Sequence, residues 1–71
     1  MALDEKFAST VVFFNVEGKP VAYDVGGDWW CRRFDLPGYP RYNGAVAVKD
    51  GTVITEQEFR DMVAEFEKPN E

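Results

Sequence analysis

Histidine is absent from this 71-residue sequence, and serine and cysteine occur once each, as Ser9 and Cys31. Without histidine, the chain lacks the usual zinc ligand and the side chain that most often moves protons near neutral pH. A single cysteine excludes an intramolecular disulfide, so the sequence does not call for an oxidising compartment. No histidine is available to activate Ser9 or Cys31 as a nucleophile. We therefore expect no catalytic residue, no metal and no cofactor, and we interpret the chain as a non-enzyme.

Long apolar runs are also missing from the sequence. No segment approaches the roughly 20 apolar residues that a membrane-spanning helix needs. Asp4 and Glu5 lie near the N-terminus, where a signal peptide would have its apolar stretch. The sequence therefore predicts no membrane association and a cytoplasmic location.

The acidic charge is concentrated in the last third of the chain. The net charge is −5, yet residues 1–49 contain six acidic and six basic residues, whereas residues 50–71 contain seven acidic and two basic ones. A protein that binds a phosphate backbone needs a basic surface. We therefore expect no direct nucleic-acid binding.

The composition predicts one small folded domain. The sequence is 45% hydrophobic and 15% aromatic, unlike disordered segments, which are poor in aromatic residues. A chain this short has a marginal core, so each large apolar side chain matters. We expect a flexible lead-in at 1–8, a single α+β domain at 9–68 and a tail at 69–71.

The first predicted element is a β-hairpin. Residues 9–16 and 19–25 are rich in β-branched and aromatic residues, and Glu17-Gly18 lies between them as a two-residue turn. Pro20 cannot donate a backbone hydrogen bond, so its strand is an edge or its nitrogen points outward. The register of such a hairpin matches apolar residues across the strands. The expected pairs are Phe14 with Val21, Val12 with Tyr23, Phe13 with Ala22 and Val11 with Asp24.

Two further segments have strand character. Residues 28–34 could form a middle strand with Trp30, Arg32 and Phe34 on one face and Trp29, Cys31 and Arg33 on the other. Residues 35–44, which contain two prolines and two glycines, are expected to be a loop. Asp50-Gly51 is a strong hairpin signal, so residues 45–48 and 52–54 are predicted to pair, with Val48 opposite Val53 and Ala47 opposite Ile54.

The last predicted element is an amphipathic helix at 56–67. Thr55 and Glu58 have the spacing of a capping box. The helix has one apolar stripe, formed by Phe59, Met62, Val63 and Phe66. The sequence thus predicts a small antiparallel sheet, made of two hairpins and a possible middle strand, with this single helix packed on one face. The other face of the sheet and its edges would then be free for a partner.

The segment from Trp29 to Tyr42 concentrates five of the eleven aromatic residues and three of the eight basic ones. Tryptophan, tyrosine and arginine are enriched at binding hot spots, because each combines contact area with a polar group. We predict that this segment binds a protein partner and that the chain is a small inhibitor or regulator of a host macromolecular machine. The predicted contact residues are Trp29, Trp30, Arg32, Arg33, Tyr39, Arg41 and Tyr42. The alternative is that both tryptophans are core residues and that the arginines lie over them.

Two other functions are consistent with the sequence. The acidic face of the C-terminal helix could imitate a nucleic-acid backbone and act as a decoy, although an ordinary solvated helix face has the same pattern. The acidic residues of this face are Glu58, Asp61, Glu65 and Glu67. The chain could also be a homo-oligomeric structural subunit, for example a homodimer, that pairs through an exposed strand edge.

Two resemblances bear on these hypotheses. The run 27–30, followed by Gly38-Tyr39-Pro40 and an apolar segment expected to be a strand, resembles the second half of a Src homology 3 domain over about twenty residues. In that family a tryptophan and a proline–tyrosine pair line a groove for proline-rich peptides. The chain departs from the family because it has no long acidic loop before the tryptophans and ends in an amphipathic helix, so we do not assign it there. In size, acidity and composition, the chain is similar to the small accessory proteins that phages direct against host machinery.

Overall fold

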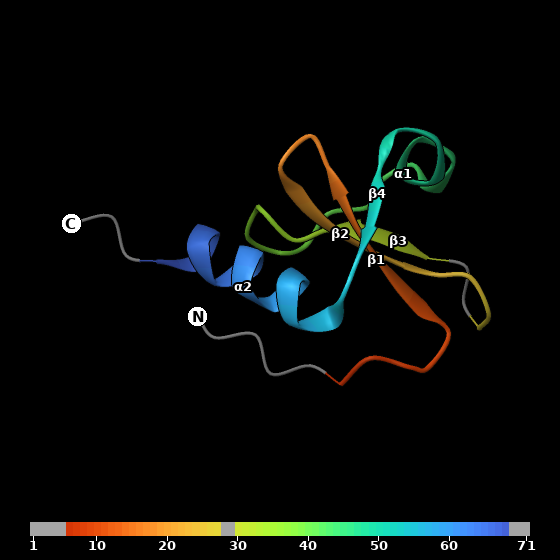
Figure 1. The fold of residues 1–71 in the computed structure, drawn as a ribbon, viewed down its shortest axis with the longest axis horizontal. Helices are drawn as coiled ribbons and strands as arrows, with labels where there is room; N and C mark the ends of the chain where they lie inside the picture. Colours follow the sequence, from red (N-terminus) through yellow and green to blue (C-terminus); the bar gives the residue numbers. More distant parts are fainter. Residues whose placement is uncertain (1–5, 28–29, 69–71) are drawn as a thin grey trace.

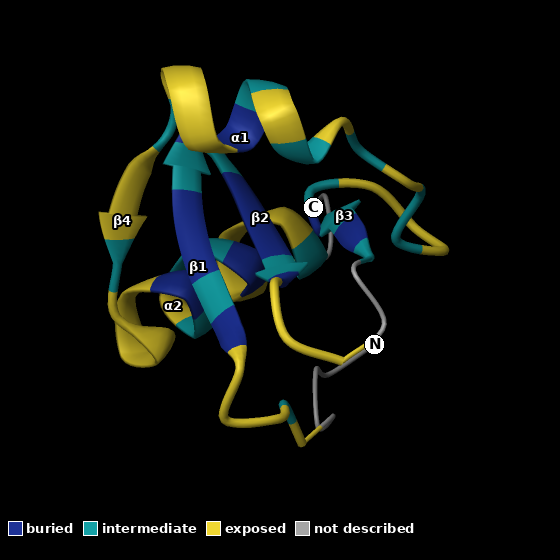
Figure 2. Ribbon diagram, turned by 90° about the vertical axis from the view of Figure 1, so that its right-hand side faces the viewer, coloured by how far each residue is buried: buried dark blue, intermediate teal, exposed yellow. Residues whose placement is uncertain are grey.

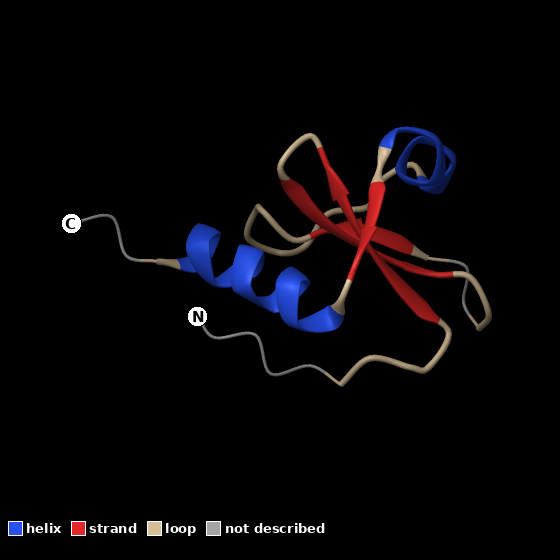
Figure 3. Cartoon of the chain, in the orientation of Figure 1, coloured by secondary structure: helices blue, strands red, loops and turns tan. Residues whose placement is uncertain are grey.

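A computed structural model describes residues 6–27 and 30–68 of the chain, and within these ranges it has four strands and two helices (Figure 1). The elements are β1 (Val11–Val16), β2 (Lys19–Asp24), β3 (Cys31–Arg33), α1 (Gly44–Asp50), β4 (Thr52–Ile54) and α2 (Glu56–Glu67). The strands form one antiparallel sheet in the order β3-β2-β1-β4. The predicted α+β class, with a C-terminal helix packed on the sheet, is confirmed (Figure 3).

The β1–β2 hairpin has the predicted register, including Phe14 opposite Val21 and Phe13 opposite Ala22. Its turn has a φ of 54° at Glu17 and 83° at Gly18. A turn of type I′ needs positive φ at both central residues, and its twist matches that of the flanking strands. Local turn chemistry therefore fixes which face each side chain of the hairpin occupies.

The helix α2 begins and ends where the sequence predicts. The Thr55 hydroxyl accepts a hydrogen bond from the Glu58 backbone N–H at 3.1 Å, and the Glu58 carboxylate accepts one from the Thr55 N–H at 2.9 Å. These reciprocal bonds satisfy two N–H groups at the start of the helix. Lys68 is extended at the other end, as expected for a residue that precedes a proline.

The face of the sheet under α2 is packed with aromatic rings. Phe59 and Val63 of α2 are fully buried there, and the Phe59 ring centroid lies 4.7 Å from that of Phe13 and 5.1 Å from that of Phe34. Phe7, which the sequence places in the lead-in, also packs edge-on against Phe59 at 5.6 Å. Packing of the domain thus begins before residue 9. We call the buried set the α2-side core: Val11, Phe13, Ala22, Phe34, Phe59 and Val63.

The predicted second hairpin is wrong. Residues 44–50 form the helix α1, and β4 pairs with β1 instead, with Val53 opposite Phe14. Asn43 caps α1 by accepting a hydrogen bond from the Ala45 N–H at 2.9 Å. β1 has a second edge on the side away from β2. In the observed fold β4 covers that edge, and α1 lies over the sheet.

A helix lies on each side of the sheet, so the expected uncovered face is wrong as well (Figures 1 and 2). The α1-side core contains Phe14, Val16, Val21, Cys31 and Ala47. Two glycines let α1 approach the strands closely. A Cβ on Gly44 would lie 2.6 Å from the Tyr23 ring, and one on Gly51 would lie 3.0 Å from a Val16 methyl.

The strand order settles the position of Pro20. Because β2 lies between β1 and β3, it is not an edge strand. The Pro20 carbonyl accepts a hydrogen bond from the Phe34 N–H at 2.8 Å. In an antiparallel strand the nitrogen and the carbonyl of one residue point the same way, so the missing donor of Pro20 faces away from β1. The predicted edge position is therefore wrong, and the Pro20 nitrogen faces the β3 side of β2.

Within residues 6–27 and 30–68, neither helix has the length and the hydrophobicity that crossing a membrane requires.

Candidate binding site

The predicted site residues in and next to β3 lie on both faces of the sheet. Trp30 is half-buried beside the α2-side core, which also contains Phe34, whereas Cys31 is buried in the α1-side core. Tyr42 is half-buried against the α1-side core, and its N–H donates to the Cys31 carbonyl at 2.8 Å. Trp29 lies outside the described residues.

Two of the three predicted arginines make internal hydrogen bonds. Arg32 donates from Nη1 to the backbone carbonyl of Tyr39 at 3.0 Å. Arg33 donates to both carboxylate oxygens of Asp35, at 2.8 and 2.7 Å. Arg41, by contrast, is exposed to solvent. Arg32 and Arg33 thus hold the 35–39 loop in place, whereas the sequence predicts that they contact a partner.

The loop that these arginines hold is a tight turn. The Tyr39 N–H donates to the Leu36 carbonyl at 3.3 Å, and Gly38 has a φ of 82°. Pro37 followed by a glycine with positive φ is the sequence signature of a type II turn. Tyr39 itself has a φ of 47°, which is uncommon for a residue with a Cβ and persists only where its surroundings hold it.

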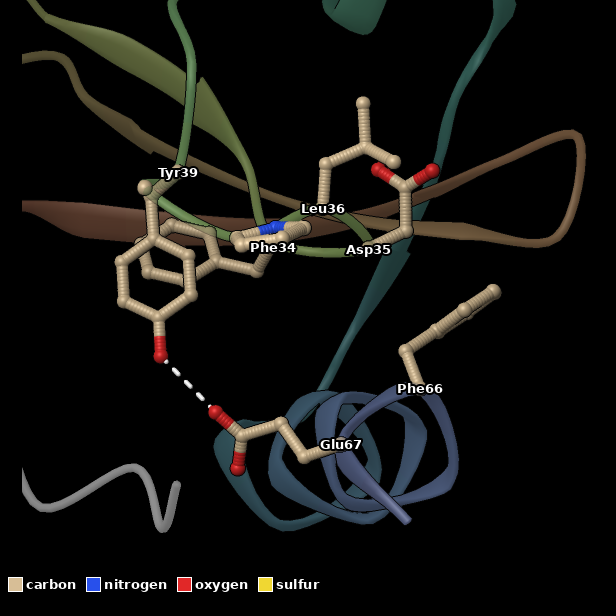
Figure 4. A pocket seen from close by; sticks show the side chains of 8 residues that line it. Phe34, Asp35, Leu36, Tyr39, Phe66 and Glu67 are labelled. Atoms are coloured by element: carbon tan, nitrogen blue, oxygen red, sulfur yellow. Dashed lines mark hydrogen bonds between the residues drawn. The ribbon is translucent and has the colours of Figure 1, made fainter. Parts of the chain in front are cut away.

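Tyr39 connects this turn to the last turn of α2. Its ring lies 4.2 Å from that of Phe34, centroid to centroid, and its hydroxyl donates to a carboxylate oxygen of Glu67 at 2.9 Å (Figure 4). Residues 28 positions apart in the sequence are therefore joined by one hydrogen bond. The turn and the helix end together form the two walls of a cavity.

The cavity has a volume of about 380 Å³ and is lined mainly by apolar groups. Its lining residues are Phe34, Asp35, Leu36, Pro37, Gly38, Tyr39, Phe66 and Glu67. Phe66 points from the helix toward the loop, with Leu36 and Asp35 across from it (Figure 4). Leu36 is 44% exposed and Phe66 is 50% exposed, so the rim of the cavity shows apolar surface to solvent. We call this feature the Leu36–Phe66 pocket.

Of the predicted contact residues that the structure describes, only Tyr39 lines the pocket, and sequence reasoning missed Leu36 and Phe66. Phe66 is the last member of the predicted apolar stripe of α2. The fully buried members of that stripe are Phe59 and Val63, whereas Phe66 is half exposed. An apolar helix stripe that extends beyond the sheet on which it packs leaves an exposed apolar patch. The sequence does not reveal this patch, because it does not show where the sheet ends beneath the helix.

The two charged residues that line the pocket, Asp35 and Glu67, are both acidic. The hydrogen bonds from Arg33 lower the pKa of the Asp35 carboxyl, so Asp35 is ionised and already paired. Among the described residues, Glu67 has no ion-pair partner. The last turn of α2 contains no basic residue, and the carbonyl end of a helix carries a partial negative charge.

The predicted acidic surface of α2 is engaged in local contacts. Glu58 belongs to the capping box, Asp61 accepts from Gln57 at 2.9 Å, and Glu65 pairs with Lys68 at 3.1 Å. Glu67 faces the pocket and contacts Tyr39. Glu67 therefore contacts the aromatic turn, and the acidic decoy stays a prediction for all four carboxylates.

The edges of the sheet differ in what they offer to a second copy of the chain. The 40–42 segment covers the outer edge of β3, through hydrogen bonds such as Arg33 N–H to the Pro40 carbonyl at 3.0 Å. At the β4 edge, the alternation of antiparallel pairing directs the N–H and C=O of Val53 outward, away from β1. Such a short edge is a poor template for strand pairing. The homodimer stays a prediction.

The two candidate nucleophiles occupy contrasting positions. Cys31 is buried, and burial raises the pKa of its thiol to about 11, so the thiolate form is rare at neutral pH. Ser9 is exposed in the turn before β1. Within residues 6–27 and 30–68, no cluster of acidic residues and cysteine is arranged to hold a metal ion.

Comparison of the chain with protein-family models, with curated proteins and with solved structures finds no match. The apolar segment in the resemblance to a Src homology 3 domain is the helix α1, not a strand. The class of the protein therefore follows from its own fold and site: a small α+β domain with a preformed apolar pocket.

Proposed function

We propose that this chain is a non-enzymatic protein-binding domain, a small inhibitor or regulator of a macromolecular machine. It docks through the surface formed by the 29–42 segment and the end of α2. The observation that carries this proposal is the Leu36–Phe66 pocket, where two exposed apolar side chains flank an apolar cavity. Contiguous exposed apolar surface on a small domain is typical of an interaction site.

The chemistry of the described residues supports binding over catalysis. The buried, protonated thiol of Cys31 is a weak nucleophile, and the sequence has no histidine to act as a base. The anchored turn supports binding in another way. Tyr39 is fixed by Arg32, by Glu67 and by its own turn, so little conformational freedom is lost when a partner docks there.

Capture of the partner tests the proposal. The tagged 71-residue chain is incubated with extract of the organism that encodes it, and bound proteins are identified by mass spectrometry. We expect one specific partner whose capture falls at least about fivefold with Leu36→Ser and with Arg41→Ala, since both side chains are exposed on the proposed surface. Val53→Thr is the matched control, because Val53 is 66% exposed and lies on β4.

Ionic strength separates this proposal from the acidic decoy. An interface centred on apolar contacts weakens little between 0.1 and 0.5 M salt, whereas one made of helix carboxylates weakens steeply. Capture that is lost at 0.5 M salt and unaffected by Leu36→Ser would favour the decoy.

Sedimentation of the isolated chain tests the homodimer. A cytoplasmic location, which the buried free thiol fits, is tested by cell fractionation.

A further inference from the structure

We infer that the Leu36–Phe66 pocket receives a large apolar side chain of a protein partner that has a lysine or arginine next to it in its sequence. The inference rests on the proposed function and names the chemistry of the partner. Three observations carry it: the size and lining of the cavity, the rigidity of its loop wall, and the sign of the charge at its helix wall.

The cavity has room for one large side chain and part of its neighbour. A cavity of about 150 Å³ with apolar walls already admits benzene, and the Leu36–Phe66 pocket has about 380 Å³. The rings of Phe34 and Tyr39 form one side, and Phe66 forms the other (Figure 4). Burying a half-exposed phenylalanine and leucine against an incoming apolar group is favourable, because both lose contact with water.

The loop wall is formed before any partner arrives. The Arg32 guanidinium holds the Tyr39 carbonyl at 3.0 Å, and the Tyr39 hydroxyl holds Glu67 at 2.9 Å. The two ends of the Tyr39 residue are thus fixed to β3 and to α2 respectively. A side chain that enters the cavity meets a fixed surface, which is the usual property of an anchor pocket.

The charge around the pocket selects a basic neighbour for the anchor. Asp35 is balanced by Arg33 at 2.7 Å, but the Glu67 carboxylate faces the cavity from a helix end without a basic residue in its last turn. Lys68, the next residue, pairs with Glu65 at 3.1 Å. An anionic group beside the anchor would be repelled by Glu67 and by the carbonyl end of α2, whereas a cationic group would be attracted.

Three peptide probes test the inference directly. They are N-acetylated, C-amidated heptapeptides with the sequences Gly-Gly-Arg-Phe-Arg-Gly-Gly, Gly-Gly-Glu-Phe-Glu-Gly-Gly and Gly-Gly-Arg-Ser-Arg-Gly-Gly. Each is titrated to millimolar concentration into the isotope-labelled 71-residue chain, and amide chemical shifts are followed by NMR. We expect the Arg-Phe-Arg probe to shift the amides of Leu36, Gly38, Tyr39, Phe66 and Glu67. The Glu-Phe-Glu probe should bind about two- to fivefold more weakly. The Arg-Ser-Arg probe should bind about tenfold more weakly or worse.

Two variants assign these preferences to named side chains. Phe66→Ala should weaken both phenylalanine probes about tenfold, because it removes one apolar wall. Glu67→Gln keeps an oxygen for the Tyr39 hydroxyl but removes the charge, so the two phenylalanine probes should bind this variant equally well. Val53→Thr should change neither result.

The inference is overturned if the Arg-Phe-Arg probe leaves the pocket amides unshifted at millimolar concentration, or if the Arg-Ser-Arg probe binds as well. It is also overturned if Glu67→Gln preserves the preference for the basic probe. These failures are distinct from failure of the proposed function. A captured partner that still depends on Leu36 and Arg41 would uphold the function and reject only this ligand chemistry. Absence of any specific partner would reject the function itself.

Discussion

The two faces of the sheet are filled in different ways. Under the 12-residue α2, aromatic rings of Phe7, Phe13, Phe34 and Phe59 interlock, so large side chains fill the space. Under the 7-residue α1, the buried side chains are smaller on average, and glycines at both ends of the helix let its backbone approach the strands. A chain of 71 residues therefore builds one core from side-chain volume and another from close backbone contact. The two cores should respond to different substitutions.

Deleting the central ring of the α2-side core should have the largest effect. Phe59→Ala removes a fully buried ring that contacts three others, and we expect a loss of about 3–5 kcal/mol in the free energy of unfolding. Val21→Ala, at a fully buried position of the α1-side core, should cost about half as much, because fewer carbon atoms are removed. Urea unfolding of both variants measures the difference. A larger loss for Val21→Ala would reverse the comparison.

Adding one methyl group at Gly51 should have the next largest effect. The new Cβ would clash with the Ala47 carbonyl and lie 3.0 Å from a Val16 methyl, which would push α1 off the sheet. We expect a loss of about 1–3 kcal/mol, the usual range for an overpacked site. Gly44→Ala, which meets the Tyr23 ring, should act in the same direction. Thermal unfolding measures both. If both variants were as stable as the natural chain, close approach of the backbone would not be what holds α1.

Ionisation of the Cys31 thiol, in the α1-side core, should have the smallest effect on the stability of the fold at neutral pH. This effect should grow as the pH rises. The pKa of Cys31 is about 11 in the folded chain and near its ordinary value of 9.0 when unfolded. Between these values the folded state keeps a proton that the unfolded state loses, so stability falls as pH rises through this window. Cys31→Ala lacks this component. We expect the natural chain to lose stability relative to Cys31→Ala between pH 8 and pH 10.5.

Urea unfolding at matched pH checks this expectation. The two chains differ only at residue 31, so pH-dependent contributions from the rest of the chain cancel in the difference between them. A difference in the free energy of unfolding that stays constant from pH 8 to pH 10.5 would mean that the Cys31 thiol is accessible to water.

The site was predictable only in part. The concentration of aromatic and basic residues directs attention to the 29–42 segment, and the structure shows that Tyr39 of this segment lines the pocket. The same pattern could not show that Arg32 and Arg33 bond internally, because their acceptors depend on how the loop folds back. Phe66 was interpreted as part of the helix stripe, and its exposure depends on where the sheet ends beneath α2.

Elements whose signals lie within a few residues of one another follow from local sequence alone. The Glu17-Gly18 turn sets the register of the first hairpin, and the Thr55–Glu58 capping box starts α2. Tertiary structure decided the rest. Residues 45–48 are all apolar and precede an Asp-Gly pair, as a hairpin strand could, yet they belong to α1, where Ala47 is buried, and β4 pairs with β1, about 40 residues away. The physical reason is that strand pairing and pocket walls depend on surfaces brought together by the whole fold, whereas turns and caps are satisfied locally.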